Sequence, residues 1–476
     1  MVKKISPKHL VLFFLMGMFW ACKTPELTSR PENKNTPAGY ISAQDSTNSA
    51  KIQWREYFTD PYLSALIDTA LRNNQELNIV LQEINISKNE IRARQGEYLP
   101  FVNVGAGIGI DKSGEYTRNG AVEENLEIKP GKEFPKPLPD FMVGVYASWE
   151  LDVWKKLRNA KKAAVLRYAA SAEGRNFLQT NLVAEITNSY YELMALDNML
   201  SIVRQNMDLQ SNALSVIKLE KEAAKVTQLA VNRFEAQLLN TQNLQYEILQ
   251  KIVEAENRIN FLAGRFPQPI ERNSASFNNM AFGVVNAGIP SQLLVNRPDI
   301  RQAELELAAA RLDIKVAKAN FYPQFRLTAG VGLQSFNPVY LLDVKSILYN
   351  LAGDMIAPLV NRNAIKANYL NANAKQIQAI YNYEQTILNA HIEVINQLNR
   401  IDNFTKSFET KSKEVDILTQ SINISNSLFR SARADYVEVL LTQREALESR
   451  IDLVEIKLKQ MQSKVNIYKA LGGGWN

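Results

Sequence analysis

Apolar residues recur at every seventh position through long segments of both halves of the chain. In the second half the repeat runs without a miss through Ile380, Ile387, Val394, Ile401, Phe408, Val415, Ile422, Phe429 and Tyr436. The first half carries the same stripe at Ile186, Leu193, Leu200, Met207 and Leu214. Such a stripe is typical of long helices that supercoil against partner helices. No glycine or proline occurs from residue 359 to 471, so we expect helical arms on the order of 100 Å long at 1.5 Å per residue.

The second stripe changes phase after Tyr436 and continues at Leu440, Leu447, Val454, Met461 and Tyr468. A change of phase is what a helix shows when it turns back antiparallel to itself. We therefore predict that each arm is a helical hairpin.

Shorter segments alternate between apolar and polar or small residues, which is the pattern of β-strands. We expect four strands, at about 100–111, 140–152, 323–335 and 347–358. In the first of them the apolar positions are Val102, Val104, Ala106, Ile108 and Ile110. About ten residues of this alternation is the length of a transmembrane β-strand, but a half-buried strand of a soluble sheet alternates identically. The alternation alone leaves both interpretations open.

The chain is duplicated. Residues 99–109 resemble residues 322–332, 223 positions later, and residues 259–264 resemble 468–473, about 209 positions later. The shorter second offset reflects a longer insertion in the first copy, at 111–139. We predict an N-terminal periplasmic segment at 23–57, a first repeat at 58–264, a linker at 265–287 and a second repeat at 288–476. Each repeat would contain a helix, two strands and a helical arm.

The first 22 residues read as a signal peptide. Lys3, Lys4 and Lys8 precede an apolar run at 10–20, which ends at Ala21 and Cys22. Cys22 is the only cysteine, so an internal disulfide is excluded. Residues 19–22 resemble a bacterial lipobox, which predicts lipidation of Cys22 after cleavage. The alternative is an ordinary signal peptide that contains a cysteine. Delivery to a membrane favours the transmembrane interpretation of the strands, because no later apolar run is long enough for a spanning helix.

Charge and composition exclude several function classes. Three lysines and no acids leave with the signal peptide, so the net charge falls from +6 to +3 and no basic field indicates nucleic-acid binding. His391 is then the only histidine, and we interpret it as a packed helix residue rather than a catalytic one. No tetrahedral metal spacing and no phosphate-binding glycine loop is present. We expect no enzyme, no cofactor and no metal, and an energy source outside this chain.

Residues 288–323 contain the passage Asn296-Arg297-Pro298-Asp299-Ile300, which is highly specific. This passage closely resembles the signature of the TolC-like outer membrane efflux family, in the subgroup of lipoproteins paired with resistance-nodulation-division pumps. Trp54, Phe58 and Asp60-Pro61 resemble the opening of that family, and residues 470–475 resemble its ending. The resemblance spans residue 54 to the end of the chain.

The resemblance implies an α+β membrane protein in which three chains each give four strands to a trimeric transmembrane β-barrel. A long antiparallel α-helical coiled-coil tunnel would continue the barrel through the periplasm. The expected function is a passive exit channel for drugs or other small solutes in the Gram-negative outer membrane. The expected partners are two further copies of the chain, a periplasmic adaptor, an inner-membrane pump and outer-membrane lipid. The alternatives are a type I secretion exit channel and a peripheral coiled-coil lipoprotein without a pore.

The resemblance also carries over individual residues. The hairpin tips, expected to dock the adaptor, fall at Ala223, Ala224, Lys225, Ser431, Ala432 and Arg433. Many family members have glycine at the positions of Ala224 and Ala432, so we expect turns here without left-handed backbone. Asp435 and Glu438 would lie on nearly the same helical face and form a periplasmic gate that selects cations. The alternative is that the tips are ordinary helix surface and that both acids face solvent outside the channel.

Overall fold

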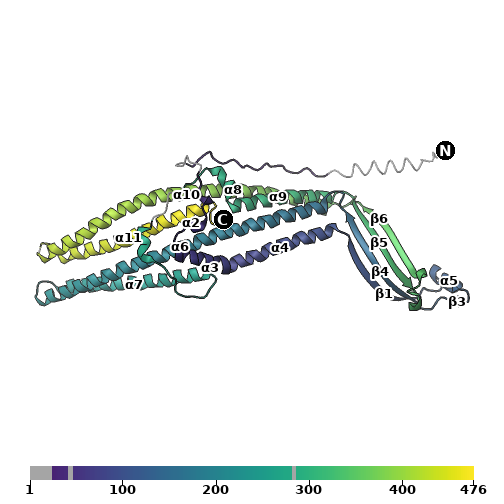
Figure 1. Ribbon diagram of the computed structural model, residues 1–476, viewed down its shortest axis with the longest axis horizontal. Helices are drawn as coiled ribbons and strands as arrows, with labels where there is room; N and C mark the ends of the chain where they lie inside the picture. The colour runs from purple at the N-terminus through teal and green to yellow at the C-terminus, as the bar shows by residue number, and fades with distance from the viewer. Residues whose placement is uncertain (1–23, 41–46, 281–285, 432, 476) are drawn as a thin grey trace. The chain divides into compact units, whose positions relative to one another are not determined.

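The computed structural model describes residues 24–40, 47–280, 286–431 and 433–475 (Figure 1). The chain divides into two compact units. The first unit is formed by Asn85–Ala169 and Leu305–Tyr381 with the N-terminal segment up to Pro31, and it holds the strands. The second unit is formed by Glu32–Ile84, Ala170–Glu304 and Asn382–Asn476, and it holds the helical hairpins.

The first unit contains a four-stranded antiparallel meander in the order β1-β4-β5-β6. Its strands are β1 (Phe101–Asp111), β4 (Leu138–Leu151), β5 (Gln324–Ser335) and β6 (Ile347–Ile356). Each observed boundary lies within two residues of the expected one. The insertion between β1 and β4 holds α5 (Arg118–Asn125) and a small hairpin of β2 (Glu127–Lys129) and β3 (Lys132–Glu133).

The register of the sheet separates two faces of different chemistry. One row across all four strands joins Val104, Val145, Val331 and Tyr349, and the adjacent row joins Asn103, Tyr146, Gly330 and Asn350. The apolar face is exposed in the chain, with Val104 at 78% and Ile108 at 80% of full exposure. A shift of one residue in the pairing would move the apolar side chains of a strand to the other face of the sheet. The observed register therefore places the apolar side chains of all four strands on one continuous surface.

Glycines let the strands approach closely on the polar face. Gly144 lies opposite Gly332, and a Cβ atom at position 332 would stand 2.6 Å from the carbonyl oxygen of Val143. The ring of Tyr146 lies against Gly105 and Gly330, and a Cβ atom at position 330 would stand 3.1 Å from it. Paired glycines of this kind are a way in which sheets are curved.

Helices make up most of the remaining described residues and follow one another in the same order in both repeats. The first repeat has α3 (Pro61–Asn73), α4 (Gln75–Tyr98), α6 (Lys156–Glu222) and α7 (Gln228–Leu262), preceded by the short α2 (Trp54–Tyr57). The second has α8 (Leu293–Asn296), α9 (Pro298–Ala319), α10 (Asn363–Arg430) and α11 (Tyr436–Ala470). Short 3-10 turns occupy Ser49–Lys51, Ser274–Asn279, Pro290–Gln292, Pro338–Tyr340 and Val344–Ser346. None of the helices in the described part of the chain combines the length and apolar character needed to cross a membrane.

The second unit buries much of the heptad stripes between its helices, although the α10 stripe is only half-buried from Ile401 to Phe429. Ile186 and Leu193 are fully buried on α6, and Leu447, Val454, Met461 and Tyr468 are buried on α11. All six of these residues share one core with α3, where Asp60 caps the helix by accepting hydrogen bonds from the amides of Tyr62 and Leu63. The predicted reversal between the stripes lies after α10, which ends at Arg430, and before α11, which begins at Tyr436, so Tyr436 belongs to the returning helix.

Both returning helices end on a glycine that touches the start of its own repeat. Gly264 has φ +66° and Gly472 has φ +92°. A Cβ atom at position 264 would stand 2.3 Å from the carbonyl oxygen of Asn73. A Cβ atom at position 472 would stand 2.5 Å from the carbonyl oxygen of Asn296. The structure therefore pairs Gly264 with Gly472, at an offset of 208, and corrects the alignment of residue 264 with 473 by one position.

The linker between the repeats is tied to the first hairpin. Arg272 donates to both carboxylate oxygens of Asp197 on α6, at 2.6 and 2.9 Å, and to Glu256 on α7 at 2.6 Å. Phe277, which is fully buried, joins the same core.

Candidate functional site

The tip of the first hairpin is a left-handed turn built on alanine. Ala224 has φ +54°, so the expectation of a turn without left-handed backbone is wrong at this position. The Lys225 amide donates to the Glu220 carbonyl at 2.9 Å, and the Ala224 amide donates to the Lys221 carbonyl at 2.9 Å. These two bonds form a Schellman motif, which satisfies the last carbonyls of α6 and holds its C′ residue in the left-handed region. Ala223, Ala224 and Lys225 are all exposed.

The tip of the second hairpin repeats part of this arrangement. The Arg433 amide donates to the Leu428 carbonyl at 2.9 Å, 208 positions after the equivalent bond of Lys225. The Ser431 hydroxyl donates to the Leu428 carbonyl at 2.9 Å. Ser431 and Arg433 are exposed, and Ala432 lies outside the described residues.

The two candidate gate acids occupy the first turn of α11. Asp435 is the N-cap residue with extended backbone (φ −83°, ψ 153°), and Glu438 lies within the first helical turn. The expected placement of both acids on nearly the same helical face is therefore wrong, because Asp435 precedes the helix. Their Asp-x-x-Glu spacing fits a capping box, but the Asp435 side chain makes no capping hydrogen bond. Both acids are exposed.

An apolar cluster joins the two hairpins near these tips. Leu214, Ile217, Ala230, Val231 and Phe234 of the first hairpin form its buried centre, and the second hairpin adds Phe429, Tyr436 and Leu440. Ala230, at the start of the returning helix of the first hairpin, is fully buried here.

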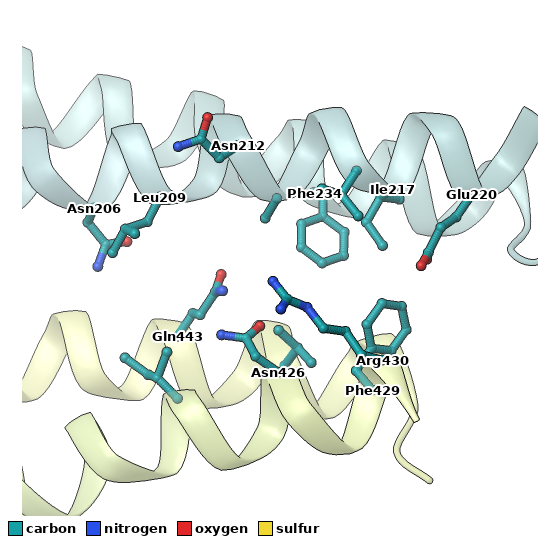
Figure 2. A pocket seen from close by; sticks show the side chains of 14 residues that line it. Asn206, Leu209, Asn212, Ile217, Glu220, Phe234, Asn426, Phe429, Arg430 and Gln443 are labelled. Carbon is teal, nitrogen blue, oxygen red and sulfur yellow. The ribbon is translucent and has the colours of Figure 1, made fainter. Parts of the chain in front are cut away.

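A cavity of about 240 Å³ lies beside this cluster, between α6 and α7 on one side and α10 and α11 on the other (Figure 2). Its apolar lining includes Ile217, Phe234 and Phe429, and its polar lining includes Asn426, Arg430 and Gln443. None of these residues is among the site residues predicted from the sequence. One signal is present in the pattern, because Gln443 follows Leu440 by three positions and so places an amide at a heptad core position.

The signature residue Arg297 is a buried structural link at the other end of the second hairpin. Its guanidinium donates to both carboxylate oxygens of Asp299, at 3.0 and 2.7 Å, and to Glu393 of α10 at 2.7 Å. Burial acts to lower the pKa of Arg297, but its hydrogen bonds and charge interactions with Asp299 and Glu393 outweigh burial and raise it. The Arg-Pro-Asp passage thus holds α9 against α10.

The remaining predicted residues give no reactive centre in the described parts of the chain. His391 packs on α10 with its ring stacked on Tyr40 at 5.5 Å between centroids. No group of three or more histidine, cysteine, aspartate or glutamate side chains is placed to hold a metal among the residues that the structure describes. Cys22 lies outside them.

Solved structures of other proteins share this fold. The open state of the Neisseria gonorrhoeae MtrE outer membrane channel matches with a TM-score of 0.82 and 22% identity, over 95% of this chain and 99% of that one. A crystal structure of CusC matches with a TM-score of 0.81 and 22% identity, over 94% of this chain and 99% of that one.

Sequence comparisons cover nearly the whole chain. The pyoverdine export outer membrane protein OpmQ of Pseudomonas aeruginosa is 28% identical over 99% of this chain and 98% of its own length. The solvent efflux pump outer membrane protein SrpC of Pseudomonas putida is 28% identical over 98% of each chain. The probable outer membrane lipoprotein SilC of Salmonella typhimurium is 26% identical over 95% of this chain and 93% of its own length. The profile of the outer membrane efflux protein family matches residues 66–265 and 289–473, and the chain therefore belongs to that family.

Proposed function

We propose that this protein is the passive exit channel of a tripartite efflux pump in the Gram-negative outer membrane. The observation that carries the proposal is the sheet, whose apolar face is continuous across four strands and exposed in the chain. Exposed apolar surface of this extent marks a partner or a membrane. Membership of the outer membrane efflux protein family supports membrane as the partner of this surface.

The barrel would close by trimerisation. Among the described residues, β1 pairs only with β4 and β6 only with β5, so both edges of the sheet have free backbone groups. Four strands are too few to enclose a pore, and pairing each β1 with the β6 of a neighbouring copy removes all edges. The close approach of Gly144 and Gly332 on the polar face supports curvature toward that face.

The hairpin tips would dock a periplasmic adaptor. Their exposed small residues, Ala223, Ala224 and Ser431, allow another backbone to approach, and Lys225 and Arg433 add positive charge. The inner-membrane pump would supply the energy and select the cargo, because relatives of similar identity are named for pyoverdine, solvents and cations. Lipidation of Cys22 would add an anchor to the outer membrane.

The pore can be tested with two matched lysine substitutions on neighbouring positions of β1. Ile108 faces the proposed lipid side, whereas Gly107 faces the polar side and has nothing within 4 Å of a built Cβ atom. Ile108→Lys should lower the amount of protein in the outer membrane, because a lysine facing lipid costs about 2–4 kcal/mol near the bilayer centre. Gly107→Lys should leave insertion intact and change single-channel conductance in planar bilayers. A wild-type protein that purifies as a monomer and forms no channels would overturn the proposal.

The docking tips can be tested with Ala432→Trp. The bulky side chain should abolish efflux and adaptor cross-linking while the trimer still assembles. Undiminished cross-linking in that variant would remove the tip from the docking surface without affecting the assignment of the pore.

A further inference from the structure

A tyrosine ring lies flat on the polar face of the sheet, over glycines of three strands. The ring of Tyr146 extends along β4 toward Gly144, where a built Cβ atom would stand 3.1 Å from the Tyr146 hydroxyl oxygen. Built Cβ atoms on the two flanking strands would meet opposite edges of the ring, at 3.1 Å from Cδ1 for Gly330 and at 3.4 Å from Cε2 for Gly105. The ring therefore extends both along the strand and across the strands, so its plane is parallel to the sheet.

The sheet covers one face of this ring and leaves the other face toward the polar side. Tyr146 is half-buried, and the glycines beneath it have no side chains that would lift the ring. Its hydroxyl donates to the Met142 sulfur at 3.2 Å, which holds the far end of the ring on its own strand. The Asn350 side-chain oxygen shares the space over Gly330, since a built Cβ atom there would stand 2.4 Å from it. The polar face thus presents an aromatic surface with an amide oxygen beside it.

Charges of opposite sign balance at one end of this face. Glu150 of β4 and Asp354 of β6 both lie opposite Arg326 of β5 in the register. Lys156 forms an ion pair with Glu150. Two acids therefore meet two bases at this level, about 13 Å along the strand from Tyr146 at 3.3 Å per residue.

Negative charge is in excess at the other end of the face. Asp111 and Asp140 lie on the same side of the sheet as Gly105 and Gly144. The Asp140 carboxylate accepts from the side-chain amide of Gln334, a neutral partner, at 3.0 Å to each oxygen. The connection 112–137 holds five basic and five acidic residues, and 336–346 holds one of each, so neither connection offsets the two acids. A wall with this excess attracts cations and repels anions.

We propose that Tyr146 is a contact surface for organic cations of the quaternary ammonium class inside the channel. A cation over the face of an aromatic ring, within about 6 Å of its centroid, is attracted by the negative charge of that face. The acids attract cations of every kind, whereas the ring favours those whose charge is carried by weakly hydrated, apolar groups. The inference rests on the proposed function, because the polar face lines a channel only in a closed barrel, where three copies of the ring would lie at one level.

The experiment compares phenyltrimethylammonium with benzenesulfonate, which has the same aromatic ring and the opposite charge. Saturation-transfer difference NMR measures the binding of each compound to the full-length protein in nanodiscs of zwitterionic lipid, with empty nanodiscs as the blank. We expect saturable binding of the cation in the millimolar range. The anion should bind at least about threefold more weakly, the fold-change of one exposed cation–π contact. Equal binding of the two compounds, or no saturable binding of the cation, would overturn the proposal.

Three variants locate the site. Tyr146→Leu should weaken binding of the cation at least about threefold, because it removes the aromatic face and keeps an apolar side chain. Tyr146→Phe keeps the ring and should bind the cation as wild type does. Tyr349→Leu is the matched control, since Tyr349 is an exposed tyrosine on the apolar face of the same sheet. Unchanged binding in Tyr146→Leu, or equal losses in Tyr146→Leu and Tyr349→Leu, would refute the site.

Single-channel recordings in planar bilayers separate this inference from the proposed pore. The wild type and the three variants should all conduct. A wild-type protein that conducts but does not distinguish the two compounds would refute the inference and leave the pore intact, whereas a protein that forms no channels would overturn both.

Discussion

Asn74 and Arg297 occupy equivalent positions in the two repeats and make the same contact. The Asn74 side-chain amide donates to the Leu262 carbonyl at 2.9 Å, and the Arg297 guanidinium donates to the Ala470 carbonyl at 2.9 Å. Each acceptor is the last residue of the returning helix of its own repeat. The duplication therefore preserves a structural link while changing its chemistry from a neutral amide to a buried cation.

Replacing Arg297 with methionine should destabilise the protein strongly. The variant keeps an extended side chain but leaves Asp299 and the Ala470 carbonyl without their partner, and breaking a buried ion pair in this way costs about 3 kcal/mol. Thermal unfolding of the purified protein followed by circular dichroism measures the loss. Arg444→Met is the control, because Arg444 is exposed and lies 3.7 Å from Glu448, a pair that contributes little. Equal losses in the two variants would contradict the assigned role of Arg297.

The glycines at the ends of the returning helices should not tolerate alanine. Gly264→Ala and Gly472→Ala each place a Cβ atom against a backbone carbonyl, on a left-handed backbone that alone costs about 1–2 kcal/mol. We expect each to lower the free energy of unfolding by more than that amount. Gly96→Ala is the opposite control, since Gly96 lies within α4 with open space around it and alanine should add about 1 kcal/mol there. Unfolding midpoints that rise for all three variants would exclude the close contacts.

The heptad stripes and the strand alternation predicted much of the fold because both are local periodicities. The buried positions Ile186, Leu193, Leu447 and Val454 follow from the seven-residue spacing, and the four strands follow from alternation. The contacts of Arg297 do not, because Glu393 and Ala470 lie 96 and 173 positions away in the chain. Only the resemblance to the efflux family indicated that the passage around Arg297 has a particular role.

The tip geometry and the cavity were beyond sequence reasoning for different reasons. Residue preference argued against a left-handed Ala224, and the two carbonyl bonds of the Schellman motif override that preference. The cavity depends on how closely the two hairpins pack against each other. The heptad stripe of one helix carries no information about that distance. Gln443 is the exception, because an amide at a heptad core position is visible in the sequence.

Ala224→Gly should stabilise the first hairpin tip. Glycine adopts φ +54° without the steric cost that alanine bears, although its greater freedom in the unfolded chain offsets part of the gain. The net gain should stay below about 1 kcal/mol and should slow hydrogen exchange of the Lys225 amide, which closes the turn. Ala223→Gly provides the contrast, because the backbone of residue 223 is not left-handed. In that variant the hydrogen exchange of the Lys225 amide should become faster. Faster exchange in both variants would show that the turn is not strained.

The last prediction concerns Asp435 and Glu438, which we propose as the gate. Three-fold assembly would turn each exposed acid at the start of α11 into a ring, and a ring of carboxylates attracts cations and repels anions. The double variant Asp435→Asn, Glu438→Gln should therefore shift the reversal potential of single channels in a salt gradient toward zero and change their resting conductance. A control double variant, Glu409→Gln with Glu445→Gln, removes the same charge from exposed positions of α10 and α11 away from the tip and should leave selectivity unchanged. The Asp435 side chain makes no capping hydrogen bond, so circular dichroism of the double variant should match wild type. Unchanged cation selectivity with an intact helix would assign both acids to the outer surface of the arm.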